Sequence, residues 1–264
     1  MKTFLMWSGG KDSGASLIIC HQHGIPLDGV IFSEVMFDHS RGISGENPIF
    51  IDWIYNHAIP IIRNMGYEVF VVKDKSDYIQ EFFYIPKRTT KPERAGKHAA
   101  FFLGGRCVGN RNLKMRPIRE FLKSQGDCIE IVGIAADEKE RLSRLKARGE
   151  NKRSVLAEYG ITEDGAYELC RQYDLLSPIY QTKTRGGCWF CPNQGIKELY
   201  ALRRDYPHLW NELVELSKTP NLISYGFKYG KTVQEVEAEI DKYAEILDWQ
   251  SRQMTFDFDF KEEV

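Results

Sequence analysis

A short glycine-containing loop near the start of the chain constrains the fold more than any other feature. Residues 3–7 are apolar and predict a buried strand, residues 8–13 have the sequence Ser-Gly-Gly-Lys-Asp-Ser, and residues 13–23 predict a helix. Gly9 and Gly10 allow backbone N–H groups to turn toward an anion without a Cβ in the way. The start of the following helix adds unpaired N–H donors and a partial positive charge. This arrangement predicts a phosphate-binding site, to which the lysine and the two serines of the loop contribute side chains.

Strand and helix patterns alternate along the first half of the chain. Short apolar runs predict strands at residues 3–7, 29–35, 67–72 and 129–136, and helices are predicted between them at residues 13–23, 48–65, 97–103 and 111–124. This alternation predicts a doubly wound α/β fold with a parallel sheet. After residue 141 the pattern is mostly helical, with helices predicted at residues 162–173, 195–204, 207–217 and 232–249. We expect a nucleotide-binding domain at residues 1–145 and a helical cap at residues 146–264.

The composition excludes a membrane protein and indicates an anionic partner. The 264-residue chain has no apolar run of the roughly 20 residues that cross a bilayer, and its apolar start is too short for a signal peptide, so we expect a cytoplasmic protein. The net charge is −1, yet residues 87–123 hold eleven Lys and Arg against two Glu. Such a basic stretch suggests a nucleic acid or a phosphorylated acceptor as ligand. The alternative is a solvated helical face.

Two of the six cysteines form a motif. Cys188 and Cys191 make a C-x-x-C segment on a glycine-rich turn, which would aim two thiolates at one metal ion. Metal centres of this kind usually take four ligands, and Cys107 and Cys170 are the candidates for the other two. Zinc and a [4Fe-4S] cluster both fit thiolate ligands. The alternatives are a redox disulfide or a purely structural role, and the remaining cysteines, Cys20 and Cys128, are predicted to lie in the core.

Charged residues at the ends of the later elements are further site candidates. Asp137 and Glu138 follow the fourth predicted strand, where they could hold Mg²⁺ or bind substrate; alternatively they are acids favoured by a helix N-terminus. Arg141 could pair with them or bind phosphate. Lys114 could reach phosphate from the start of its helix, or be an ordinary surface charge.

The loop sequence is neither Walker A nor the dinucleotide-binding G-x-G-x-x-G. It resembles the PP-loop of the ATP-pyrophosphatase superfamily. Residues 107–118, with a Cys, a Lys and a Pro, and residues 133–141, with the pattern G-x-x-x-D-E-x-x-R, are similar to the phosphoadenosine-phosphosulfate reductase and DndC-like branch. The resemblance implies the strand order 3-2-1-4-5 and a nucleotide at the carboxyl ends of the strands. It also favours a [4Fe-4S] cluster over zinc.

The same resemblance implies an enzyme that binds ATP with Mg²⁺, cleaves it between the α and β phosphates and transfers the adenylyl group to an acceptor. We expect this reaction to serve sulfur transfer or nucleic-acid modification. The protein would then work with a sulfur donor or with a partner in a complex. The reductases of that branch use a C-terminal cysteine as nucleophile, and this chain has none after Cys191. The alternatives are a non-catalytic nucleotide-binding subunit of a modification or defence complex, or a sulfonucleotide reductase that uses a partner's thiol. The predicted catalytic residues are Lys11, Asp12, Asp137 and Glu138, and the predicted nucleotide ligands are Ser8, Gly9, Gly10, Lys11, Asp12, Ser13, Lys114 and Arg141.

Overall fold

A computed structural model describes residues 1–102, 107–147, 149, 151–181 and 186–259. Its largest element is a five-stranded parallel sheet made of β1 (Lys2–Met6), β2 (Gly29–Glu34), β5 (Val69–Lys73), β6 (Cys128–Val132) and β7 (Lys152–Arg153). The strands lie in the order β5-β2-β1-β6-β7. In chain order this is third, second, first, fourth and fifth, so the α/β fold class and its strand order are confirmed. A separate antiparallel pair, β3 (Met36–Asp38) and β4 (Ile43–Ser44), follows β2.

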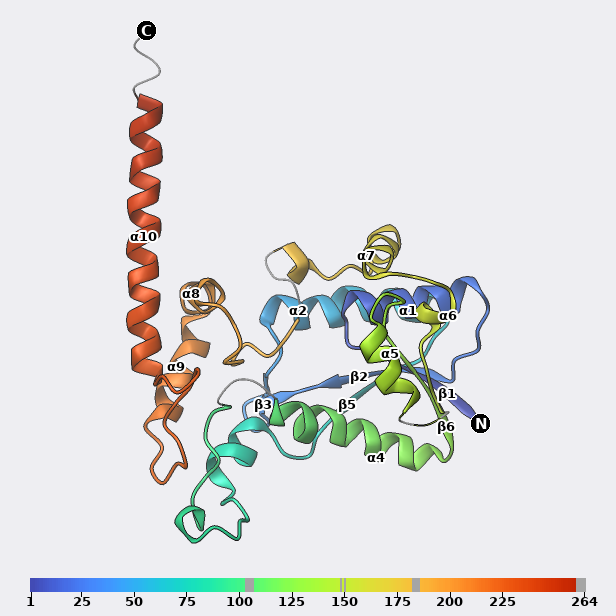
Figure 1. Cartoon of the computed structure of the whole chain (residues 1–264), viewed down its shortest axis with the longest axis horizontal. Coiled ribbons are helices and arrows are strands. Elements are labelled where there is room, and N and C mark those ends of the chain that lie inside the picture. Colours follow the sequence, from blue (N-terminus) through green and yellow to red (C-terminus); the bar gives the residue numbers. More distant parts are fainter. Residues whose placement is uncertain (103–106, 148, 150, 182–185, 260–264) are drawn as a thin grey trace. The chain divides into compact units, whose positions relative to one another are not determined.

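Helices cover both faces of the sheet (Figure 1). Successive side chains of a strand point to opposite faces, and β1 illustrates this: Leu5 packs in the cluster that contains α1 (Lys11–Gln22), whereas Phe4 packs with Ile118 of α4 (Met115–Gln125). The first face also receives the helix formed by α2 (Pro48–Trp53), a π-turn (Ile54–Ala58) and α3 (Ile59–Asn64), as well as α6 (Val155–Glu158) and α7 (Glu163–Gln172). A π-turn (Asn110–Lys114) precedes α4, and α5 (Lys139–Lys146) follows β6.

The chain divides into two compact units, Met1–Tyr78 with Gly109–Trp189, and Ile79–Val108 with Phe190–Val264. The first unit holds the whole parallel sheet. The second contains a π-turn (Gln80–Tyr84), a 3₁₀ turn (Pro92–Arg94), α8 (Ile196–Asp205), α9 (Pro207–Ser217) and α10 (Val233–Asp259). These bounds differ from the expected division at residue 145, because β7, α6 and α7 complete the first unit and the described residues between 79 and 108 belong to the same unit as the C-terminal helices.

One helix prediction is wrong. Among the described residues 97–102 no helix forms. His98 instead bridges to Leu222, and Ala100 has a positive φ of 68°, which a helix does not accommodate. In the part of the chain that the structure describes, no helix is both long enough and apolar enough to cross a membrane.

Candidate functional site

The loop at residues 8–13 connects the central strand β1 to α1, and its own two serines brace it. Ser13 Oγ accepts a hydrogen bond from the backbone N–H of Ser8 (3.0 Å) and donates one to the carbonyl of Gly10 (3.0 Å). The hydroxyl oxygens of Ser8 and Ser13 lie 3.1 Å apart. Ser13 is buried, so these bonds hold the loop in one conformation.

Two glycines allow other parts of the chain to approach this loop closely. Gly9 has a φ of 72°, and a Cβ there would lie 2.6 Å from side-chain atoms of Phe50 and Ile54. Gly133, directly after β6, has the loop itself as neighbour: a Cβ would lie 2.6 Å from the backbone N of Ser13 and 2.7 Å from the carbonyl carbon of Asp12. The end of β6 therefore packs backbone to backbone against the start of α1.

The last three residues of this loop form the first turn of α1. Gly10 is its N-cap residue and has no side chain to satisfy the first backbone N–H groups. The N–H of Lys11 donates to the hydroxyl of Tyr180 (2.9 Å), and the N–H of Gly10 lies 3.4 Å from Ser8 Oγ. A helix start of this kind carries a partial positive charge and suits an anion.

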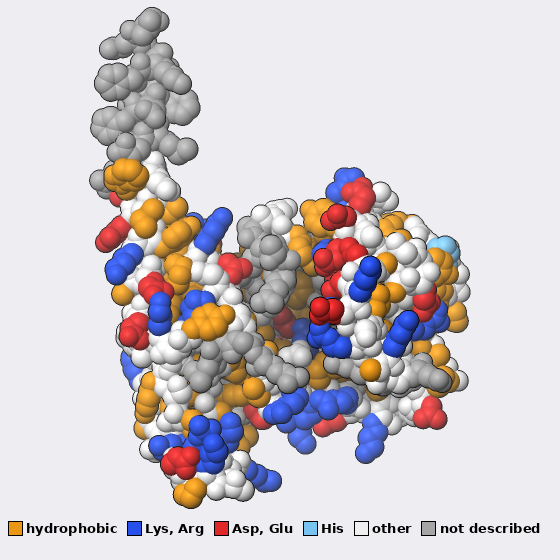
Figure 2. Space-filling view, in the orientation of Figure 1, with side chains coloured by type: hydrophobic (Ala, Val, Ile, Leu, Met, Phe, Trp, Pro, Cys, Tyr) orange, Lys and Arg blue, Asp and Glu red, His pale blue; other side chains and the backbone are white. Residues whose placement is uncertain are grey.

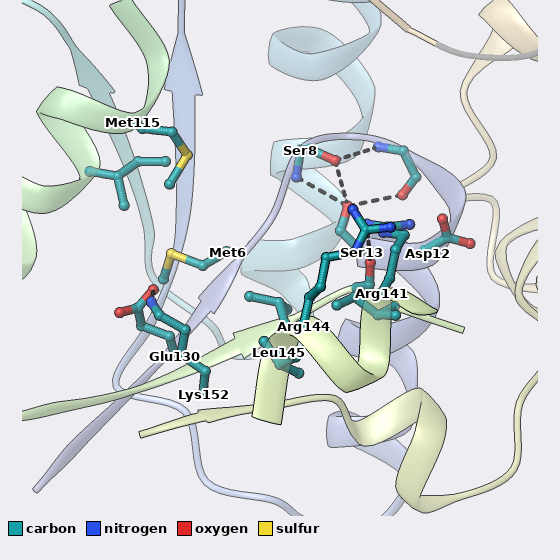
Figure 3. Close-up of a pocket in the computed structure, with 15 residues that line it drawn as sticks. Met6, Ser8, Asp12, Ser13, Met115, Glu130, Arg141, Arg144, Leu145 and Lys152 are labelled. Atoms are coloured by element: carbon teal, nitrogen blue, oxygen red, sulfur yellow. Dashed lines mark hydrogen bonds and ion pairs between the residues drawn. The ribbon is translucent and has the colours of Figure 1, made fainter. Parts of the chain in front are cut away.

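A cavity of about 420 Å³ opens beside the loop, within the range of roughly 300–1,000 Å³ that small-molecule sites occupy. It lies over β1 and β6, which is where the strand order reverses and where open α/β sheets bind ligands. Arg141 and Arg144 extend from α5 toward the loop (Figure 3). The lining also includes Ser8, Gly10, Asp12, Ser13 and Gly133 at the loop, apolar side chains of Met6, Met115, Ile118, Val132, Ile134 and Leu145, and the ion pair of Glu130 with Lys152.

Lys11 forms two ion pairs in this region. Its ammonium lies 2.8 Å from Asp12 Oδ1 and 3.1 Å from Glu163 Oε1. Burial by itself would lower the pKa of Lys11, but the hydrogen bonds to these two carboxylates outweigh it and raise that pKa above its ordinary value. The lysine is therefore charged at neutral pH.

Three carboxylates lie close together, and two of them are the ion-pair partners of Lys11. One ligand oxygen from each of Asp12, Glu138 and Glu163 lies within 4.8 Å of the other two. Arg141 orients Glu138 through two hydrogen bonds of 2.5 and 2.7 Å. Carboxylate oxygens are the protein ligands that Mg²⁺ prefers, so the chemistry of this donor set suits a divalent cation, which would share the carboxylates with Lys11 and Arg141. Glu163 was not among the site residues predicted from the sequence.

Two predicted site residues have other partners. Asp137 accepts a hydrogen bond from the backbone N–H of Glu163 (3.2 Å), at the start of α7. Its position matches the helix-start alternative considered for it. The Lys114 ammonium lies 3.5 Å from Glu46 Oε1, and the Glu46 side chain is almost fully buried. Lys114 therefore neutralises a buried acid.

The four cysteines predicted to bind one metal are divided between the compact units. Cys170 and Cys188 belong to the first, and Cys107 and Cys191 to the second. Cys170 is fully buried against α1, where its thiol donates to the carbonyl of Lys11 (3.1 Å). Burial raises the pKa of this thiol to about 12. We therefore assign Cys170 to the core and remove it from the metal set. Within each unit, the described residues place no cysteine in a group of three potential ligand side chains.

Cys188 is partly exposed and its segment is tied to the first unit by main-chain contacts. The backbone of Cys188 bridges to Glu46, and Trp189 donates from its backbone N–H to Gly45 O (3.0 Å) and from its indole to Ser44 O (2.8 Å). The predictions for Cys20 and Cys128 are confirmed, since both side chains are buried among apolar residues.

No protein-family model matches the sequence, and no curated protein matches it. Among solved structures, the chain is similar to the U34-tRNA thiolase NcsA from Methanococcus maripaludis with its [4Fe-4S] cluster. The identity is 16%, the match covers 91% of this chain and 72% of that one, and the TM-score is 0.40. A likeness at this level does not bear on the chemistry of the loop.

Proposed function

We propose that this protein is a PP-loop enzyme that binds an adenine nucleotide, cleaves ATP between its α and β phosphates and transfers the adenylyl group to an acceptor. One observation carries the proposal. The Ser-Gly-Gly-Lys-Asp-Ser loop joins the central strand to α1 beside a cavity at the point where the strand order reverses. This is the position at which open α/β sheets bind nucleotides.

In this reaction the protein would position the nucleotide and offset the charge of its phosphates. The N–H groups of the loop and the Ser8 hydroxyl would hold the phosphates, with Ser13 bracing the loop, while Lys11 and Arg141 offset their negative charge. An acceptor oxygen would then attack the α-phosphorus; the new P–O bond forms as the bond to the bridging oxygen breaks, and pyrophosphate leaves. Asp12, Glu138 and Glu163 would hold Mg²⁺, which supplies charge neutralisation at the phosphates when bound.

We propose a polyanion, such as a nucleic acid, as the acceptor. Arg111 of the π-turn that precedes α4, together with Arg119 and Lys123 of α4 itself, is exposed, and all three residues line one surface pocket. No ion pair involves these three cations among the residues that the structure describes. Lys and Arg side chains gather on the surface over α4 (Figure 2). Unpaired cations of this kind bind phosphates in a salt-dependent manner.

Pyrophosphate release tests the reaction directly. Protein incubated with ATP, Mg²⁺ and low-salt tRNA or DNA should release pyrophosphate and form AMP or an adenylylated acceptor. Binding of ATP without any pyrophosphate would favour the non-catalytic subunit. Reduction of a sulfonucleotide with added thioredoxin, without ATP cleavage, would favour the reductase that uses a partner's thiol.

Nucleotide binding is expected to depend on the serine that braces the loop. Ser13→Ala removes the acceptor for the Ser8 N–H and should raise the ATP dissociation constant by up to about tenfold, since one neutral hydrogen bond contributes roughly 0.5–1.5 kcal/mol. Calorimetric titration with ATP measures this. Ser16→Ala is the matched control, because Ser16 is a buried serine of α1 that bonds only the carbonyl of Asp12 among the described residues (2.8 Å). Equal ATP affinity in both variants would argue against the loop as phosphate site.

We also propose that Cys188 and Cys191 ligate a metal centre, with Cys107 as a further ligand. This rests on the C-x-x-C spacing, and thiolates fit either zinc or a [4Fe-4S] cluster. Serine at Cys188 or Cys191 is expected to reduce the metal content of anaerobically purified protein by at least about half, because each thiolate is a direct ligand.

Metal analysis and the visible spectrum measure this content. Cys170→Ser is the control, since its hydroxyl can still donate to Lys11 O, and it should leave the metal content unchanged. Loss of metal in Cys170→Ser alone would restore that residue to the site.

A further inference from the structure

The segment that follows β7 holds Lys11 at three separate points. Glu163 Oε1 lies 3.1 Å from the ammonium, the thiol of Cys170 donates to the carbonyl (3.1 Å), and the hydroxyl of Tyr180 accepts from the backbone N–H (2.9 Å). The contact with Glu163 involves the side chain of Lys11, and the contact with Cys170 involves its carbonyl. Only the contact with Tyr180 occupies an N–H at the start of α1, which is one of the donors that a bound anion would use.

The hydroxyl of Tyr180 is held at this position by its surroundings. Tyr180 lies on a 3₁₀ turn (Pro178–Gln181), and its ring packs edge-on against Tyr167 at a centroid distance of 6.3 Å. It also joins the partly buried apolar residues around the main core. Its hydroxyl oxygen lies 3.3 Å from where a Cβ of Gly10 would be. Gly10 lines the cavity, so this oxygen lies within contact distance of a residue of the cavity wall.

The Tyr180 hydroxyl accepts a hydrogen bond but donates none to the described residues. A phenol offers one O–H donor together with acceptor lone pairs. The lone pairs receive the Lys11 N–H, and no acceptor for the phenolic proton is found among the described residues. Burial raises the pKa of Tyr180, against the opposing effect of the Lys11 N–H, so the proton stays on the oxygen at neutral pH. The site thus presents a fixed neutral donor beside the loop.

We propose that Tyr180 is a phosphate-binding residue of this site: its hydroxyl accepts the Lys11 N–H and donates its proton to a non-bridging phosphate oxygen of the nucleotide. This rests on the proposed function. Because the Tyr180 oxygen accepts a hydrogen bond from the helix N–H, its own O–H becomes a stronger hydrogen-bond donor to the ligand. The phosphate cradle then has two sides, the serine-braced loop and the 3₁₀ turn that follows α7.

Tyr180→Phe is the test, because it keeps the ring packing and removes only the hydroxyl. The matched control is Tyr173→Phe, since the Tyr173 hydroxyl also accepts an N–H from α1, from the side chain of Gln22 (2.9 Å), but at the opposite end of the helix. Dissociation constants are measured by calorimetry for ATP, AMP and adenosine with the full chain. We expect Tyr180→Phe to weaken ATP and AMP roughly tenfold or more. Adenosine binding should not change, and Tyr173→Phe should bind all three ligands like the wild type.

A loss for ATP alone would place the contact at the β or γ phosphate, and the following results overturn the inference. Unchanged ATP affinity in Tyr180→Phe means that the hydroxyl does not touch phosphate, and tighter binding means that it competes with phosphate for the Lys11 N–H. An equal loss for ATP and adenosine means a purely structural role. These results leave the proposed function standing, provided that the wild type binds ATP. A wild type that binds none of the three ligands removes the proposed function and this inference together.

Discussion

Gly133→Ala is expected to weaken ATP binding at least about tenfold and to lower the free energy of unfolding by about 1–3 kcal/mol, the usual effect of overpacking. The added methyl would lie 2.6 Å from the backbone N of Ser13 and 2.7 and 2.9 Å from the carbonyl carbon and oxygen of Asp12. All three are main-chain atoms, so no side-chain rotation relieves the contact. Either β6 or the start of α1 must move, and the second movement displaces the phosphate loop.

Urea denaturation and calorimetric titration with ATP measure the two effects separately. Gly165→Ala is the control, because its nearest contact is the side-chain tip of Ile161 at 3.3 Å and its helical position favours alanine. We expect that variant to be as stable as the wild type or slightly more stable. Wild-type stability and ATP affinity in Gly133→Ala would show that the end of β6 does not position the loop.

The local parts of the fold were predictable because local patterns encode them. Apolar runs of five to eight residues marked the central strands, and the loop at residues 8–13 was recognisable from its glycines and its place between a strand and a helix. The strand order came from the resemblance to a known superfamily, and the structure has the same order. β7, with only two residues, carries too little apolar signal to be predicted.

The long-range parts of the site were not predictable from one sequence. Glu163 and Tyr180 lie more than 150 residues from Lys11, which both contact, and nothing in the local pattern around them indicates this approach. Cys170 had a usable signal that was overlooked. It lies four residues after Ala166, and both side chains are fully buried on the face of α7 that packs against α1. A cysteine on such a face is more consistent with the core than with a metal centre.

Charged residues near the sheet were the least predictable, because a sequence does not reveal which acid a cation will meet. Lys114 was expected at a phosphate and instead neutralises Glu46. The neighbouring Arg116 binds Asp74 through two hydrogen bonds of 2.6 Å. The Asp74 side chain is 2% exposed and the Arg116 side chain 33% exposed. Both pairs satisfy acids that the fold buries next to the carboxyl ends of the strands.

Arg116→Met is therefore expected to lower the free energy of unfolding at neutral pH by about 3 kcal/mol, the lower end of the range for leaving a buried charge without its partner. Burial by itself would raise the pKa of Asp74, but the hydrogen bonds from Arg116 and from the Ser76 N–H outweigh it and hold that pKa below its ordinary value. An acid with a lowered folded-state pKa stabilises the fold above its unfolded pKa of about 4, and that contribution is lost as the pH falls through the folded value. The deficit of Arg116→Met should therefore shrink as the solution is acidified.

Urea denaturation of wild type and variant across the acidic to neutral range measures this deficit. Arg119→Met is the matched control on the same helix, because the Arg119 guanidinium bonds only to the carbonyls of Met115 and Arg111 among the described residues. Arg119→Met should lower the free energy of unfolding by less than about 1 kcal/mol, as surface substitutions do, and this decrease should not depend on pH. Adding Asp74→Asn to Arg116→Met should recover part of the lost stability, because the buried group is then neutral. Equal and pH-independent losses in the two arginine variants would mean that the pair with Asp74 contributes no more than an ordinary surface contact.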